Sequence, residues 1–145
     1  MIKAICFDAF GTICYYNMSG IHLFPETADV LENLKNKGLK LGIISNISKL
    51  YAGFLVKKIP FEMDCVSFPQ YSGTVKPNAI AFHYACSKLE LKPQEVLMVG
   101  DSYNNDYMGA KNAGLKALFL DTKCCNKTHE SISTLKEVTD YELFI

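Results

Sequence analysis

Residues 3–13 read KAICFDAFGTI, an apolar run that stops at the carboxylate of Asp8 and continues into a Gly-Thr turn. The segment Ile5–Phe7 has the continuous apolar character of a strand that is buried on both faces, as in a parallel sheet. Open α/β sheets build their sites in the crevice beyond the carboxyl ends of their strands. Asp8 is therefore a candidate site residue, although an aspartate at this place can also simply begin a turn.

Length and composition indicate one soluble globular domain, residues 1–145. Of these residues 49% are hydrophobic and 21% are charged, which is ordinary for a domain with a real core. The 15 basic and 15 acidic side chains cancel, so no overall field favours a nucleic acid or a membrane as partner. No apolar stretch approaches the roughly 18 residues of a membrane span, and Asp8 interrupts the first apolar run too early for a signal peptide. We expect a cytoplasmic protein.

The six cysteines are expected to be reduced thiols. They are Cys6, Cys14, Cys65, Cys86, Cys124 and Cys125. Because several lie in apolar runs and no secretory signal precedes them, core thiols are favoured over disulfides. The adjacent pair Cys124 and Cys125 lacks the spaced partners of a zinc site, and we expect it on a surface or in a loop.

Apolar runs of strand length alternate with helical patterns along the chain. After the first strand, further strands are predicted at residues 39–44, 65–68, 96–100 and 115–120. Helices are predicted at about 25–37, 49–58, 78–89, 105–113 and 131–138, and a small hairpin or flap at 13–24. This alternation predicts a three-layer, Rossmann-like α/β fold, a parallel sheet of about five strands with helices on both faces.

Polar side chains follow several of these strands. If the strands are parallel, Asp8, Ser45, Lys76 and Asp101 fall on one edge of the sheet. Carboxylates that lie close together repel one another and are tolerated best around a hard cation such as Mg²⁺. A hydroxyl and an ammonium beside them suit a phosphate. Each residue alone could be a helix cap or a solvated loop residue, but their joint occurrence favours a site.

At these positions the sequence resembles the haloacid dehalogenase-like (HAD) hydrolase superfamily. The family's first motif, Asp-x-x-Gly-Thr, resembles residues 8–12, and its second, a Ser or Thr that ends a strand, resembles Ser45. The third, Lys-Pro at the start of a helix, resembles Lys76-Pro77. The fourth, Gly-Asp-Ser with a downstream Asp and Gly-Ala, resembles residues 100–110. The resemblance covers about residues 2–121.

The resemblance implies roles for individual residues. Asp8 is the expected nucleophile, which forms an aspartyl-phosphate, and Ser45 and Lys76 are the other expected catalytic residues. The expected substrate-binding residues are Ser45, Asn46, Lys76, Ala9, Gly11 and Thr12, the last three through the backbone amides of the turn. The implied cofactor is Mg²⁺. Its expected ligands are Asp8, the backbone carbonyl of Phe10, Asp101 and Asp106.

Phe10 departs from the family's phosphatases, which usually carry a second Asp at this position. That side chain protonates the leaving group and later activates water, a contribution typically worth about 10²- to 10⁴-fold. Phenylalanine still supplies a backbone carbonyl to a metal, but it cannot transfer a proton. The sequence therefore predicts slow turnover, a bias toward good leaving groups, or a domain that only binds.

Other functions remain open beside a Mg²⁺-dependent phosphatase. Phe10 favours a catalytically impaired domain with a binding or regulatory role, whereas the intact Asp8, Lys76 and Asp101 argue against it. A 2-haloacid dehalogenase is less favoured, because the family's dehalogenases take key residues from a cap domain and do not need the magnesium pattern that Asp101 keeps. A signalling receiver domain is excluded, since its lysine comes last in the chain.

The short interval between Thr12 and Pro25 leaves room for a flap and no cap domain. A capless site is open to solvent, so it would take a large substrate or be closed by a neighbouring subunit in a homo-oligomer. The flap residues Tyr15, Tyr16 and Phe24 are candidates for that contact, and the alternative is that they cover the core. The expected partner is a phosphorylated substrate, a small molecule or a macromolecule.

Overall fold

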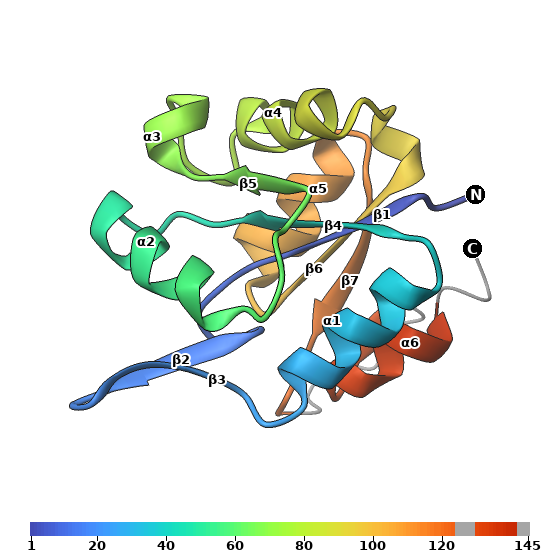
Figure 1. Cartoon of the computed structure of the whole chain (residues 1–145). Helices are drawn as coiled ribbons and strands as arrows, with labels where there is room; N and C mark the ends of the chain where they lie inside the picture. The colour runs from blue at the N-terminus through green and yellow to red at the C-terminus, as the bar shows by residue number, and fades with distance from the viewer. Residues whose placement is uncertain (124–129, 142–145) are drawn as a thin grey trace.

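The computed structural model describes residues 1–123 and 130–141, and a parallel sheet lies at its centre (Figure 1). In spatial order its strands are β5 (Cys65–Ser67), β4 (Lys40–Ile44), β1 (Ala4–Phe7), β6 (Val96–Gly100), β7 (Lys116–Leu120) and β8 (Ser131–Ile132). Every neighbouring pair is parallel. The predicted α/β fold is confirmed, with six strands in the sheet rather than about five.

A hairpin and a series of helices connect the strands. The antiparallel hairpin consists of β2 (Cys14–Asn17) and β3 (Gly20–Leu23), as predicted for the flap. The helices are α1 (Thr27–Asn36), α2 (Lys49–Lys58), α3 (Pro69–Ser72), α4 (Ala79–Leu89), α5 (Gly109–Asn112) and α6 (Val138–Tyr141). Short helical turns are η1 (Pro93–Glu95), η2 (Tyr103–Met108) and η3 (Leu135–Glu137). Only the hairpin and α1 stand between β1 and β4, an interval that is described throughout, so no cap domain is inserted there.

The sheet is buried on both faces because helices cover each of them. Side chains that alternate along β1 enter two different cores: Ile5 and Phe7 pack with α1, α2 and α6, whereas Ala4 and Cys6 pack with α4 and α5. Figure 1 shows α4 and α5 on one side of the sheet and α1 and α6 on the other. Full burial of a large apolar side chain contributes about 1.5–3 kcal/mol. These two cores fix the strand ends that carry the site.

The order of the strands creates a crevice at one edge of the sheet. From β1 the chain moves outward to β4 and β5, then returns to the opposite side of β1 with β6 and continues to β7 and β8. In such sheets the connections on the two sides of the reversal diverge and leave a crevice beyond the carboxyl ends. The residues that follow β1, β4 and β6 therefore lie around one space.

The cysteines in the described residues agree with the prediction. Cys6, Cys14, Cys65 and Cys86 are free and buried. Burial raises the pKa of Cys14, Cys65 and Cys86 to about 12, about 12 and about 11, so these thiols stay protonated and unreactive at neutral pH. Cys124 and Cys125 lie outside the described residues.

Two predicted helices differ in the structure. Residues 131–132 form the short strand β8, which pairs with the end of β7, and helical turns begin only at Leu135. The predicted helix over 131–138 was therefore wrong at its start, because two residues carry too little periodicity to distinguish a strand. The helix predicted from Asn105 begins at Tyr103 with a π-helical turn, whose Ser102 cap accepts a hydrogen bond from the N–H of Asn105 at 3.1 Å.

None of the helices in the described part of the chain combines the length and the apolar character that a bilayer crossing needs.

Candidate active site

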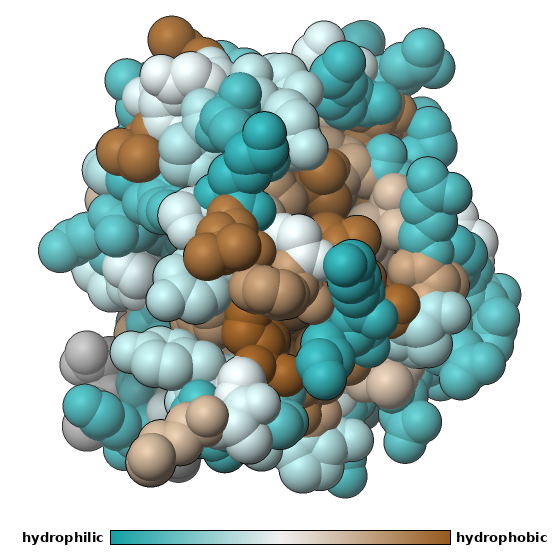
Figure 2. All heavy atoms as spheres, turned by 60° about the vertical axis from the view of Figure 1, so that its left-hand side comes forward, coloured by the Kyte–Doolittle hydropathy of each residue, from teal (hydrophilic) through white to brown (hydrophobic). Residues whose placement is uncertain are grey.

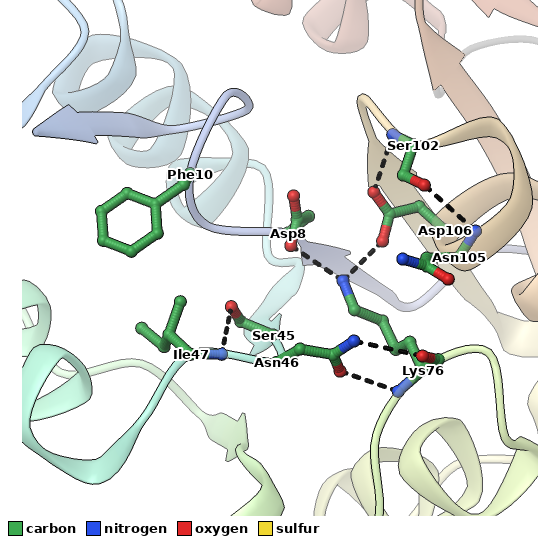
Figure 3. A pocket seen from close by; sticks show the side chains of 9 residues that line it. All are labelled: Asp8, Phe10, Ser45, Asn46, Ile47, Lys76, Ser102, Asn105 and Asp106. Carbon is green, nitrogen blue, oxygen red and sulfur yellow. Dashed lines mark hydrogen bonds and ion pairs between the residues drawn. The ribbon is translucent and has the colours of Figure 1, made fainter.

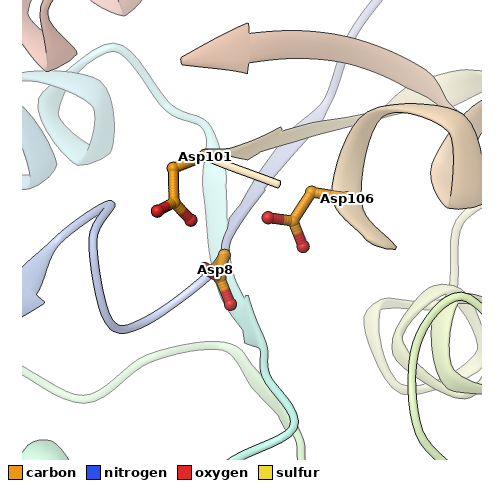
Figure 4. A group of neighbouring side chains, drawn as sticks. All are labelled: Asp8, Asp101 and Asp106. Carbon is orange, nitrogen blue, oxygen red and sulfur yellow. The ribbon is translucent and has the colours of Figure 1, made fainter. Parts of the chain in front are cut away.

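Four charged side chains meet where β1 and β6 end (Figures 3 and 4). Asp8 follows β1, Asp101 follows β6, Asp106 lies in η2, and Lys76 comes from the loop before α4. The Nζ atom of Lys76 lies 2.8 Å from Oδ1 of Asp8 and 2.5 Å from Oδ1 of Asp106. The structure thus brings together Asp8, Lys76 and Asp101, which the sequence placed at one edge of the sheet, and adds Asp106, which only the family resemblance had indicated.

The Lys76 ammonium is buried, with only 4% of the residue exposed. Burial by itself lowers the pKa of a lysine, but the adjacent carboxylates of Asp8 and Asp106 outweigh this effect, and the pKa of Lys76 is raised. The side chain is therefore a fixed positive charge at any physiological pH. Removal of one partner from such a buried pair typically costs about 3–5 kcal/mol.

Asn46 holds the backbone of Lys76 in place. Its Oδ1 accepts a hydrogen bond from the Lys76 N–H at 2.7 Å, and its Nδ2 donates to the Lys76 carbonyl at 3.1 Å. Asn46 follows β4 and also lines the site, as expected for a residue near the substrate. Its direct contact in the structure is nevertheless with the lysine, a positioning role that the motif alone did not indicate.

Asp106 is held from two directions. Its Oδ1 accepts from Lys76, and its Oδ2 accepts from the N–H of Ser102 at 3.0 Å. Burial raises the pKa of Asp106, and the Lys76 ammonium opposes that effect. A Cβ atom on Gly100 would lie 2.2 Å from Oδ2 of Asp106. The glycine of the Gly-Asp-Ser sequence is therefore required for the close approach of this carboxylate.

Asp101 is the exposed carboxylate of the group. Partial burial disfavours the charged form of Asp101, and the nearby Asp8 carboxylate adds to this effect. The pKa of Asp101 is therefore raised to about 6. The hydroxyl of Thr12 lies 3.4 Å from Oδ2 of Asp8 and 3.4 Å from Oδ1 of Asp101. Gly11 has a φ of +86°, and a Cβ there would lie 2.1 Å from Oδ2 of Asp101. A glycine at position 11 thus allows both the positive φ of the turn and the close approach of the Asp101 carboxylate.

The three carboxylates fit a divalent cation. One oxygen from each of Asp8, Asp101 and Asp106 lies within 4.8 Å of the others (Figure 4). Hard cations such as Mg²⁺ take oxygen ligands of this kind. Lys76 is the ammonium that contacts Asp8 and Asp106, so an excess of negative charge is left for a cation to offset. The donor set is therefore suited to Mg²⁺.

A pocket of about 250 Å³ opens in front of these charges (Figure 3). It is lined by Asp8, Phe10, Ser45, Asn46, Ile47, Lys76, Ser102, Asn105 and Asp106. Ser45 is almost fully buried, and its Oγ accepts a hydrogen bond from the Ile47 N–H at 3.3 Å. The sequence did not single out Ile47, Ser102 and Asn105 as site residues. Ser102 belongs to the fourth motif, and Ile47 and Asn105 each lie within two positions of a motif residue.

The turn after Asp8 uses some of its amides internally. The N–H of Gly11 donates to the Cys14 carbonyl at 2.9 Å, and the N–H of Thr12 donates to the Ala9 carbonyl at 3.1 Å. The side chain of Ala9 is buried, so only its backbone is left to contribute to binding. The predicted role of the Ala9, Gly11 and Thr12 amides in binding an anion stays a prediction.

Phe10 borders the pocket without facing Asp8. Its ring makes edge contacts with Tyr16 of the hairpin, 5.5 Å between centroids, and with Tyr51 of α2, 6.2 Å between centroids. In Figure 3 the ring points away from the Asp8 carboxylate. The position at which the family resemblance led us to expect an aspartate is thus part of an aromatic cluster here.

Several known proteins are similar in sequence to this chain. A family model described as haloacid dehalogenase-like hydrolase matches residues 16–114. A glyceraldehyde 3-phosphate phosphatase from Methanothermobacter thermautotrophicus is 35% identical over 119 residues, which are 79% of this chain and 53% of that protein. A phosphoglycolate phosphatase from Vibrio vulnificus is 32% identical over 115 residues, 73% of this chain and 48% of that protein. The chain spans about half the length of the curated relatives it matches.

Solved structures share the fold. A HAD phosphatase from Thermococcus onnurineus superposes with a TM-score of 0.84 at 21% identity, over 97% of this chain and 98% of that one. A 2-haloacid dehalogenase from Pseudomonas syringae superposes with a TM-score of 0.69 at 22% identity, over 86% of this chain and 54% of that one. Because both kinds of enzyme share this fold, the chemistry must be argued from the site.

Proposed function

The chain belongs to the haloacid dehalogenase-like hydrolase family, and from this premise we propose that it is a Mg²⁺-dependent phosphate monoester hydrolase that acts through Asp8. The observation that carries the proposal is the charged cluster, in which buried Lys76 joins Asp8 to Asp106 while Asp101 stands beside Asp8. The phosphatase names of the relatives support the same reaction. We further propose a cytoplasmic location.

In the first step the Asp8 carboxylate attacks the phosphorus atom. Lys76 holds Oδ1 of Asp8, which leaves Oδ2 as the attacking atom. A bond forms between Oδ2 and phosphorus as the bond from phosphorus to the leaving alcohol breaks, which gives an aspartyl-phosphate. Water then attacks phosphorus, and inorganic phosphate leaves as the Asp8 carboxylate is regenerated. The carboxylate thus divides one difficult displacement into two easier ones.

The surrounding residues bind and orient the phosphoryl group. The Ser45 hydroxyl and the Lys76 ammonium line the pocket and can each donate to a phosphoryl oxygen. Asp8, Asp101 and the Phe10 carbonyl would hold Mg²⁺, which offsets the negative charge of the phosphate when bound. Asp106 would be a further ligand or a support of the site, because its oxygens accept hydrogen bonds from Lys76 and Ser102 and one of them lies within 4.8 Å of oxygens of Asp8 and Asp101.

Phe10 makes turnover slow and sensitive to the leaving group. No proton reaches the departing oxygen from this side chain, so esters of acidic alcohols are favoured. The loss of such a proton donor typically lowers a rate by about 10²- to 10⁴-fold. The same residue favours the second candidate function, a domain that binds phosphate and metal without turnover.

Hydrolysis of 4-nitrophenyl phosphate with and without Mg²⁺ tests the proposal. We expect slow, metal-dependent release of phosphate that disappears in Asp8→Asn and persists in Asp29→Asn, a matched change in helix α1. If the wild type binds Mg²⁺ and phosphate but releases no product, the binding domain is the correct account. Equal rates in Asp8→Asn and the wild type would refute the nucleophile.

A further inference from the structure

A second cavity, of about 630 Å³, lies between the β2–β3 hairpin and helix α2. Its walls include the rings of Tyr16, Tyr51 and Phe54, and the ammonium-bearing side chains of Lys57 and Lys58 also line it. None of its lining residues in the described part of the chain is acidic. Ligand sites are typically about 300–1,000 Å³ and mostly apolar with a few polar groups. The second cavity has this size and this lining.

The helix presents these residues on one face. Tyr51, Phe54 and the pair Lys57 and Lys58 recur at spacings of three and four residues, which places them in a row along α2. The core uses the adjacent face, through Ala52 and Leu55. The row is left uncovered: Tyr51 and Phe54 are 48% and 49% exposed. Figure 2 shows apolar side chains gathered on this side of the molecule, with hydrophilic ones among them. Contiguous exposed apolar surface marks binding sites.

Phe10 joins the second cavity to the charged pocket. Phe10 is one of the residues that line the charged pocket, and its ring contacts Tyr16 and Tyr51, which line the second cavity. The charged pocket, at about 250 Å³, is small for a phosphate ester with a large organic group. A substrate that extends from Asp8 across the Phe10 ring would therefore enter the second cavity.

We propose that the second cavity binds the organic part of the substrate, and that the preferred substrates are phosphate monoesters of aromatic alcohols that carry a further anionic group. The rings of Tyr16, Tyr51 and Phe54 suit an aromatic group, and Lys57 and Lys58 suit a carboxylate or second phosphate. This proposal rests on the proposed function for the phosphate end. The competing occupant, a second copy of this chain, is less favoured because the cationic lining selects an anion.

Three esters of similar leaving-group acidity test the proposal: phenyl phosphate, 2-naphthyl phosphate and 6-carboxy-2-naphthyl phosphate. We expect kcat/KM to rise about tenfold from the phenyl to the naphthyl ester, as burial of a second ring predicts. The carboxylate should add about threefold, as for an exposed ion pair. Phe54→Ala should remove most of the first increase, and the double variant Lys57→Ala, Lys58→Ala should remove the second.

Lys88→Ala is the matched control, since Lys88 is an exposed lysine of helix α4. The increase in kcat/KM from the phenyl to the naphthyl ester, and the further increase with the carboxylate, should both be unchanged in this variant. Equal kcat/KM for all three esters in the wild type would overturn the proposal. Ratios that stay as in the wild type in Phe54→Ala and in the double lysine variant would overturn it as well.

A binding measurement separates this proposal from the hydrolase assignment. The probe is 6-hydroxy-2-naphthoate, which has no phosphate. Its fluorescence can be followed without a tryptophan background, because the chain has no tryptophan. We expect saturable binding that weakens about tenfold in Phe54→Ala, whether or not esters are hydrolysed. The proposal fails if the probe does not bind, or if sedimentation shows that Phe54→Ala dissociates a dimer while the probe binds as before.

Discussion

The two sides of the turn after β1 differ in how tightly the protein surrounds them. On the polar side, Lys76 is 4% exposed, and it is bonded to Asp8 and Asp106. On the aromatic side, Phe10 meets Tyr16 and Tyr51, which are 70% and 48% exposed. The polar side is therefore fixed by ion pairs, whereas the aromatic side is an exposed apolar surface.

This difference shows what the site keeps and what it lacks. The polar side holds the groups to which the proposed function assigns attack on a phosphate and its binding. Among the described residues that line the pocket, the carboxylates are Asp8 and Asp106, and no histidine is present. Both of these carboxylates contact Lys76, and Asp101 is the proposed metal ligand beside them, so none of the three is assigned the proton transfer that Phe10 cannot perform. Substitutions on each side should therefore fail in different ways.

The largest effect is expected from Lys76→Met on the polar side. Loss of the ammonium leaves Asp8 and Asp106 close together, one of them buried, which should lower the free energy of unfolding by about 3–5 kcal/mol and the Tm by about 10–15 °C. Activity should be lost. Thermal and urea unfolding measure the effect, and Lys88→Met on the surface should change stability by less than about 0.5 kcal/mol. A loss below about 1 kcal/mol in Lys76→Met would mean that the cluster is not tightly coupled.

The next effect isolates the metal site. Gly11→Ala brings a Cβ against Asp101, and it also strains the backbone because Gly11 has a positive φ. Gly38→Ala is the matched control, since Gly38 has a φ of +87° and nothing within 4 Å of its Cβ position. Both variants should lose about 1–2 kcal/mol of stability, but only Gly11→Ala should lose Mg²⁺ affinity, by about 10- to 100-fold. Calorimetric titration with Mg²⁺ measures this affinity. Equal affinities in the two variants would contradict the proposed metal site.

The smallest effect concerns pH in metal-free buffer. The pKa of Asp101 is raised from 3.8 to about 6 in the folded protein, so the folded state binds this proton more tightly than the unfolded state. Stability should therefore fall as the pH rises from about 4 to about 6. Asp101→Asn should remove this fall and raise the Tm at pH 7 by a few degrees at most, about 1 kcal/mol or less, because the group is solvent-screened. Unfolding curves at pH 4, 5, 6 and 7 test this. If the difference in Tm between the wild type and Asp101→Asn is the same at every pH, the prediction is wrong.

Much of the polar side could be predicted from the sequence, because each residue follows an apolar run or lies in a short motif. Asp8, Ser45 and Asp101 stand at strand ends, and parallel strands bring their ends to one edge. The contacts of Asn46 with the Lys76 backbone could not be predicted, since they join two loops that are 30 positions apart. The need for a glycine at position 100 could not be predicted either, because it depends on the close approach of the Asp106 carboxylate.

The aromatic side gave a weaker signal. Tyr16 and Phe54 belong to a hairpin and a helix whose contact depends on the tertiary fold, and nothing in their spacing indicates a shared cavity. The strand β8 was missed for a similar reason: two residues become a strand only because β7 lies beside them. Sequence patterns report local periodicity and strand ends, whereas these features arise from packing between distant segments.

The most direct test of the account is the rate of 4-nitrophenyl phosphate hydrolysis in Phe10→Asp, with Phe10→Asn as a control of similar size that cannot act as an acid or base. A well-placed acid–base contributes about 10²- to 10⁴-fold. If the site is a working phosphatase site without its proton donor, Phe10→Asp should recover part of this contribution and raise Mg²⁺-dependent kcat at least about tenfold, and Phe10→Asn should not. Equal rates in the wild type and both variants, with Mg²⁺ bound in each, would contradict the account.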